Sequence, residues 1–152
     1  MGRWLPNREG LKMDFLLQEL RRAGYRITDA RRAIVQALVN ASRPLNPQEL
    51  YEAARVQHPR VGLVTVYRTL EALLELGMVQ KVHGEQGCVG YVYTGRGHRH
   101  VAWCRACGRA FIFEGQEDLS SLEQSLERTL HFRVEGHLLQ LTGLCAECQA
   151  RT

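Results

Sequence analysis

The sequence predicts an α+β fold with helices concentrated in the first half of the chain and strands in the second. Apolar residues recur at helical spacing through most of residues 13–77, whereas shorter runs rich in β-branched and aromatic residues follow from residue 78 onward. Two Cys-x-x-Cys pairs stand in the last third of the chain. With 152 residues, 45% of them apolar and 24% charged, the chain is long enough for one medium domain or two small ones.

Composition and charge narrow the class of protein. No apolar run approaches the roughly 18 residues of a membrane span, and residues 1–10 lack the apolar core of a secretion signal, so we expect a cytoplasmic protein with no membrane partner. Residues 1–93 carry 13 basic and 9 acidic groups and hold the whole net charge of +4, whereas residues 94–152 carry 7 of each. A solvated surface explains this excess equally well, but the asymmetry favours a first half that meets nucleic acid.

Four amphipathic helices are expected in the first half. The sharpest signal is Asn46-Pro47-Gln48-Glu49, which combines a capping side chain, a proline at the first helical position and a glutamate at the third. Gly24 and Gly77 are residues that commonly follow a helix end. The expected helices span residues 13–23, 28–40, 46–57 and about 63–76.

A β-hairpin is expected next, with strands over 78–82 and 89–93 around the turn at 84–87. Three or four compact helices followed by a hairpin form the layout of a winged helix-turn-helix. In that layout the helix before the hairpin enters the major groove of DNA, and the hairpin lies on the backbone. Residues 1–93 are therefore predicted to be a winged-helix DNA-binding domain.

The remaining chain predicts a smaller α/β domain. Residues 94–97 have the composition of a hinge, and residues 98–152 form the second domain. A unit of fewer than 60 residues has a small core, so we expect a metal ion or a second copy of the chain to stabilise it. Its expected elements are strands at 100–103 and 109–113, a helix over 116–130 and a strand over 132–141.

Four of the five cysteines have the spacing of a structural zinc site. Each Cys-x-x-Cys pair lets two thiolates face one ion, and two pairs complete a closed tetrahedral shell that does not catalyse. A redox dithiol would need only one pair, and disulfides fit poorly with a chain that has no export signal. The predicted zinc ligands are Cys104, Cys107, Cys145 and Cys148.

The order of these motifs is distinctive. Thr65-Val66-Tyr67-Arg68-Thr69-Leu70 precedes the hairpin, His98-Arg99-His100 precedes Cys104-x-x-Cys107-Gly108, and His137 precedes Cys145-x-x-Cys148. Over roughly residues 11–149 the chain resembles the ferric uptake regulator family. The resemblance implies a homodimeric, metal-dependent transcriptional repressor and not an enzyme, with a winged-helix domain on an AT-rich palindromic operator and a C-terminal dimerisation domain.

The resemblance also implies which residues contact DNA. Thr65, Tyr67 and Arg68 lie on the helix before the hairpin, where an aromatic ring suits a thymine methyl group and a guanidinium suits guanine or phosphate. A half-buried core aromatic is the alternative for Tyr67. Weaker candidates for phosphate contacts are Arg26, Arg31 and Lys81.

Three histidines are candidates for a second, regulatory metal site. His98 and His100 are two residues apart on an expected strand, so their imidazoles project from one face, and the resemblance groups them with His137. The fourth ligand is normally a glutamate, but the matching positions are Leu119 and Ser120. We expect Glu117 to replace it, with Glu123 as the second choice; surface or capping histidines are the alternative.

The chain departs from the family pattern at another metal site, which usually reaches into the DNA-binding domain. Its expected ligand positions hold Arg99, Val101 and residues near Val92 and Pro44, so most of that site is absent. His83 and Cys88 on the hairpin would rebuild part of it; the alternative for Cys88 is an ordinary small residue of the hairpin. Three histidines and a cysteine favour zinc over Fe²⁺ or Mn²⁺, and therefore a zinc-uptake regulator-like branch.

Two other classes remain as alternatives. A zinc metalloenzyme would use the three histidines with an open fourth position, but the chain has no His-Glu-x-x-His motif and no evident site for a small organic substrate. A metal-binding interaction module would carry the winged helix incidentally.

Overall fold

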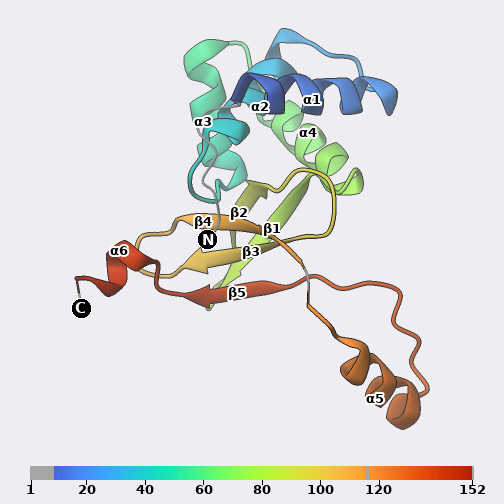
Figure 1. Ribbon diagram of the computed structural model, residues 1–152. Coiled ribbons are helices and arrows are strands. Elements are labelled where there is room, and N and C mark those ends of the chain that lie inside the picture. Colours follow the sequence, from blue (N-terminus) through green and yellow to red (C-terminus); the bar gives the residue numbers. More distant parts are fainter. Residues whose placement is uncertain (1–8, 116, 152) are drawn as a thin grey trace.

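The computed structural model describes residues 9–115 and 117–151. Four helices pack around an apolar core at one end of the molecule, above a two-stranded hairpin (Figure 1). The core is filled by buried leucines, isoleucine and valines, among them Leu20, Ile34 and Leu73, which are inaccessible to solvent. The helices are α1 (Glu9–Arg22), α2 (Asp29–Asn40), α3 (Pro47–Gln57) and α4 (Leu63–Glu75).

Local capping explains where these helices begin and end. The Thr28 side chain accepts a hydrogen bond from the N–H of Arg31 at the start of α2. At the start of α3, the Asn46 side chain accepts from the N–H of Glu49 at 2.8 Å, and the Glu49 carboxylate accepts from the N–H of Asn46 at 2.9 Å. Gly77 follows α4 with a φ of +66°, a conformation that favours glycine. The four predicted helices are confirmed.

The wing follows α4 as the antiparallel hairpin of β1 (Val79–Gly84) and β2 (Gly87–Tyr93), with a bulge after Val82. Gly90 lies against the loop before α3, where an added Cβ atom would stand 2.6 Å from the carbonyl carbon of Leu45. Only glycine permits this approach, which lets Leu45 and Tyr91 exchange backbone hydrogen bonds of 3.0 and 2.8 Å. The predicted winged helix-turn-helix is therefore confirmed.

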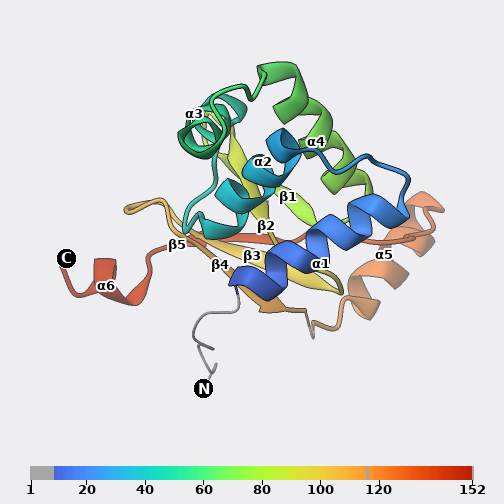
Figure 2. The ribbon, with the colours of Figure 1, turned by 90° about the horizontal axis from the view of Figure 1, so that it is seen from above.

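The second half is built on a three-stranded sheet with the order β4-β3-β5. β3 pairs antiparallel with β4 and parallel with β5. Seen from above, this sheet lies beneath the helices (Figure 2). The view of Figure 1 shows α5 well away from the four helices, and α5 has no buried residue. The elements are β3 (Arg99–Cys104), β4 (Ala110–Glu114), α5 (Ser120–Leu130), β5 (Gln140–Gly143) and α6 (Ala146–Gln149).

Two boundaries in this half were predicted wrongly. The strand expected over 132–141 is confined to Gln140–Gly143, because no strand of the described residues pairs with the stretch before it. The helix expected from residue 116 begins at Ser120, because the Asp118 carboxylate accepts the Ser120 N–H at 2.9 Å and forms a turn instead. The short helix α6 was not predicted.

The two halves share a small apolar cluster. Val82 and Val92 of the wing are buried against Val101 of β3. Partly buried residues of β3 and β4 complete the cluster, namely Trp103, Ala110 and Ile112. No helix in the described part of the chain is long and apolar enough to cross a membrane.

Candidate metal centres and nucleic-acid interface

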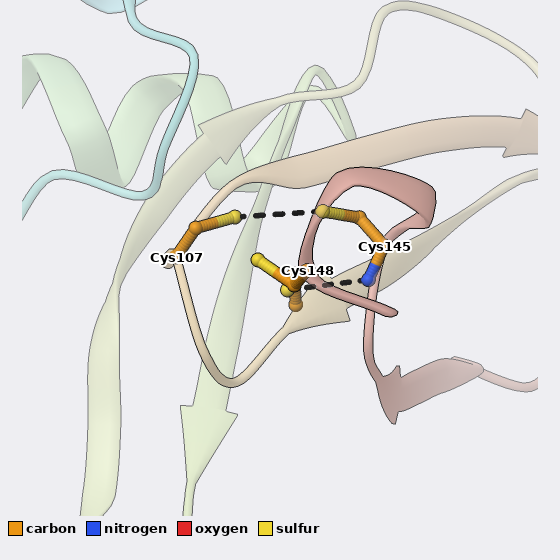
Figure 3. Close-up of side chains that lie close together, drawn as sticks. Cys107, Cys145 and Cys148 are labelled. Atoms are coloured by element: carbon orange, nitrogen blue, oxygen red, sulfur yellow. Dashed lines mark hydrogen bonds between the residues drawn. The ribbon is translucent and has the colours of Figure 1, made fainter. Parts of the chain in front are cut away.

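The structure brings the four predicted cysteine ligands together. Cys104 ends β3, and Cys107 follows in the next turn. Cys145 directly precedes α6 and Cys148 lies within it (Figure 3). All four Sγ atoms lie within 4.8 Å of one another. Two segments about 40 residues apart therefore meet as one cluster of thiols, as the spacing predicts.

Hydrogen bonds and charge around the cluster favour the thiolate form of Cys104 and Cys107. The N–H of Cys145 donates to the Sγ of Cys104 at 3.3 Å, and this bond with others from the following turn lowers the pKa of Cys104 to about 6. The Arg109 guanidinium lowers the pKa of Cys107 and lies 3.4 Å from the Sγ of Cys145. The thiol of Cys145 raises the pKa of Cys148 to about 12. The lowered pKa values of Cys104 and Cys107 favour negative charge at two of the four sulfurs, and a set of four sulfurs fits a divalent cation of the zinc type.

A second group of donors lies at the other end of β3. The Nε2 atoms of His98, His100 and His137 lie 2.6, 2.5 and 2.6 Å from one atom, Oε1 of Glu117. His98 Nε2 and His100 Nε2 are themselves 3.1 Å apart. Four donor atoms that face one small volume in this way fit the ligand shell of a single ion.

The histidines of this second group differ in their exposure to solvent. His100 is 1% exposed and His98 is 50% exposed, so the group lies at the edge of the interior and opens to solvent on one side. The pKa of the Glu117 carboxyl lies well below its usual range, mainly because its own backbone N–H donates to it and also because the three imidazoles donate to it. Glu117 is therefore an anionic oxygen donor at neutral pH.

Gly115 makes room for the histidines, and the sequence did not reveal this role. A Cβ atom added to it would lie 2.3 Å from Cδ2 of His98 and 2.4 Å from Nε2 of His100. Its N–H donates to the carbonyl oxygen of His98 at 2.8 Å. The only sequence signal was a glycine directly after a strand, which is usually a simple turn residue.

The other candidate ligands lie elsewhere. Glu123 is exposed in the first turn of α5 and belongs to neither donor group. His83 and Cys88 face each other across the hairpin. Neither joins three donors within residues 9–115 and 117–151, and the Cys88 Sγ lies 3.8 Å from the carbonyl oxygen of Gly90.

The positions of the other family site hold residues with different contacts. Arg99 donates to the carbonyl oxygen of Thr94 at 3.3 Å and faces Glu114. Val92 and Val101 belong to the apolar cluster, and Pro44 is buried. Apolar and cationic side chains thus occupy the region where that site would need ligands.

The helix α4 buries one face and leaves the other open. Val66, Thr69, Leu70 and Leu73 point into the core, whereas Arg68 is exposed, Tyr67 is 47% exposed and Thr65 is partly exposed. Arg31 is engaged within the protein, with Thr69 Oγ1 at 3.3 Å and the carbonyl oxygen of Arg26 at 2.5 Å. Lys81 lies on the wing, over the Tyr91 ring.

Comparisons with known proteins all point to one protein family. A family model described as the ferric uptake regulator family matches residues 22–142. A ferric uptake regulation protein of Campylobacter upsaliensis is 32% identical over 151 residues, which cover 95% of this chain and 96% of that protein. A peroxide-responsive repressor PerR of Staphylococcus aureus is 27% identical and is covered to 88%, as is this chain. A solved zinc uptake regulator complexed with zinc and DNA is 21% identical, with a TM-score of 0.75 over 95% of this chain and 97% of that one.

Proposed function

This chain belongs to the ferric uptake regulator family, and on that premise we propose that it is a zinc-responsive repressor that binds operator DNA as a homodimer in the cytoplasm. Members of the family are metal-responsive transcriptional regulators and not enzymes. The observation that carries the proposal is the group of His98, His100, His137 and Glu117, whose donor atoms converge on one point. No feature of the structure favours the metalloenzyme or the interaction module.

The four cysteines are proposed to hold a structural zinc ion. A shell of four thiolates is closed, so the ion has no free position for chemistry and instead ties two segments together. Here it would join the end of β3 to α6 and so fasten the end of the chain to the sheet. The low pKa of Cys104 and the nearby Arg109 support binding as thiolate.

The histidine–glutamate group is proposed to be the regulatory site. Three imidazole nitrogens and one carboxylate oxygen suit zinc, and they also bind Fe²⁺ and Mn²⁺, so the preference for zinc is the finer part of the proposal. When bound, the ion would supply positive charge between the Glu117 carboxylate and the three imidazole nitrogens, in place of the hydrogen bonds that join them in this structure. Partial exposure at His98 supports exchange with the solvent.

We propose that different parts of the chain bind DNA and form the dimer. Residues 1–93 bind DNA, residues 94–97 act as the hinge, and residues 98–152 form the dimer. Thr65, Tyr67 and Arg68 are proposed to contact an AT-rich palindrome, which the exposure of Tyr67 and Arg68 on α4 supports. Exposed apolar side chains in the second half support pairing with a second copy, among them Leu122, Leu130, Phe132 and Leu138.

Metal analysis combined with a DNA-binding titration tests the proposal. Protein purified as isolated should hold two ions per chain, of which mild chelation removes one, and zinc should be the tightly held one. Affinity for a duplex selected from a random library should rise with free zinc in the wild-type protein and should respond much less in His98→Ala. Equal metal dependence of both proteins would show that this group is not the sensor.

A further inference from the structure

One side chain links the second half of the chain to the outer edge of the wing. The Gln140 Oε1 atom accepts a hydrogen bond from the N–H of His83 at 2.8 Å. The Gln140 Nε2 atom donates to the carbonyl oxygen of the same residue at 2.7 Å. A single amide thus satisfies both backbone groups of His83, as a neighbouring strand would.

Gln140 is also tied to the histidine–glutamate group. It lies three residues after His137, and as the first residue of β5 it pairs with Val101, the neighbour of His100 on β3. The three histidines of the group line a cavity of about 580 Å³ together with Gln140 and with Lys81 and His83 of the wing. Only Leu138 and Leu139 separate His137 from Gln140 along the chain.

Few other contacts hold the wing to the sheet. The Gln80 Nε2 atom donates to the carbonyl oxygen of Arg99 at 2.8 Å, and the apolar cluster packs Val82 and Val92 against Val101. Neither of these contacts involves the segment that carries His137. Gln140 is thus the described side chain that reaches from this segment to the wing by hydrogen bonds.

We propose that Gln140 is the positioning residue that transmits occupancy of the histidine–glutamate group to the wing. Its amide holds β1 at a fixed place relative to His137, and the wing continues directly from the helix α4 that is proposed to face DNA. This inference rests on the proposed regulatory function. Gln140 would thus link the two halves of the chain through a side chain. The family's other metal site would lie in this region, but Val92 and Val101 occupy its ligand positions here.

The size of the effect follows from the two hydrogen bonds. Each contributes modestly to a folded protein in water, and the helical core does not depend on them. Gln140→Ala should therefore leave the chain folded but reduce the ratio of zinc-loaded to zinc-free DNA affinity by about tenfold, within the usual range of allosteric coupling. Gln140→Glu keeps the shape and the acceptor but cannot donate to His83, so it should lose coupling as well.

The experiment compares full-length wild-type, Gln140→Ala and Gln140→Glu proteins. Gln149→Ala is the matched control, because the Gln149 amide donates to the carbonyl oxygen of Leu144 at 2.8 Å within the second half of the chain. Fluorescence anisotropy with a duplex selected by the wild-type protein gives the affinity in buffered zinc and in chelator. Zinc affinity is measured with and without the duplex, because coupling is reciprocal.

The expected result is a cooperative melting transition only slightly lower than that of wild type, unchanged zinc affinity without DNA and a coupling ratio reduced only in the Gln140 variants. A ratio equal to that of wild type overturns the inference. An equal loss of DNA affinity in zinc and in chelator also overturns the inference, because a contact with a purely structural role would weaken DNA binding to the same extent in both conditions. If the wild-type protein itself shows no zinc dependence, the proposed function fails first, and the two failures are thereby distinguished.

Discussion

Gly115 lies so close to His100 that a Cβ atom added to the glycine would stand 2.4 Å from the imidazole Nε2. The space beside the buried imidazole is therefore set by the absence of a side chain on the neighbouring segment. This glycine precedes Glu117 by two residues, so its backbone positions both the histidines and the carboxylate.

Gly115→Ala should weaken the regulatory site specifically. The added methyl group must displace His98 or His100, and displaced or misoriented ligands typically cost about 10- to 100-fold in metal affinity. Competition with a chelator of known affinity measures the effect, while cysteine-bound zinc should be retained. Gly143→Ala is the control, because nothing lies within 4 Å of an added Cβ there. Unchanged affinity in Gly115→Ala would show that the observed packing is not required.

Cys104→Ser should remove the tightly held zinc and destabilise the second half of the chain. Cys104 is 2% exposed and receives the N–H of Cys145, so its loss breaks the cluster at its buried end. A loss of about 3 kcal/mol corresponds to a melting temperature roughly 10 °C lower in a protein of this size. Calorimetry and zinc analysis measure both effects, with Cys88→Ser as the control. Full zinc content with unchanged melting would refute the structural role.

Arg68 and Lys81 should contribute to DNA binding in different ways. Arg68 lies on the exposed face of α4, so Arg68→Ala should cost about 1–3 kcal/mol of DNA-binding free energy and relax sequence preference if the guanidinium contacts a base.

Lys81 lies on the wing, so Lys81→Ala should weaken binding to all sequences and reduce the slope of log affinity against log salt by about 1. Salt titrations with selected and scrambled duplexes separate the two. An unchanged salt slope in Lys81→Ala would argue against a phosphate contact.

Glu49 should make α3 stability dependent on pH. Burial alone would raise the pKa of Glu49, but the Asn46 N–H and the Arg43 guanidinium lower it below its ordinary value of 4.5. A lowered pKa in the folded state means that the stabilisation is present above pH 4.5 and is lost as pH falls further. Glu49→Gln should therefore melt at a lower temperature than wild type at pH 7, and the difference should shrink as the pH falls below 4.5. A difference that is constant with pH would exclude the carboxylate as its cause.

The winged helix could be predicted from sequence because its determinants are local. Asn46 and Glu49 cap α3 through atoms three residues apart, and Gly24 and Gly77 follow helices with positive φ values. Such signals lie within a few residues of the element that they define. The paired Cys-x-x-Cys motifs are equally local, so the cysteine group could be foreseen as well.

The remaining features depend on distant neighbours. Alternating residues over 132–139 are compatible with a strand, but a strand also needs a hydrogen-bonding neighbour, and among the described residues β3 provides one only from Leu139 onward. The roles of Gly115 and Gln140 depend on the space and the backbone groups opposite them. Neither property leaves a trace in the spacing of residue types.

The most direct test compares Glu117→Ala with Glu123→Ala in a titration of operator affinity against free zinc. Both changes remove one carboxylate from the same part of the chain, but only Glu117 lies within 2.6 Å of the three imidazoles, whereas Glu123 is exposed on α5. If the histidine–glutamate group is the sensor, Glu117→Ala should need at least about tenfold more free zinc to bind the duplex, and Glu123→Ala should follow the wild-type curve. Identical curves for Glu117→Ala and wild type would contradict the assignment.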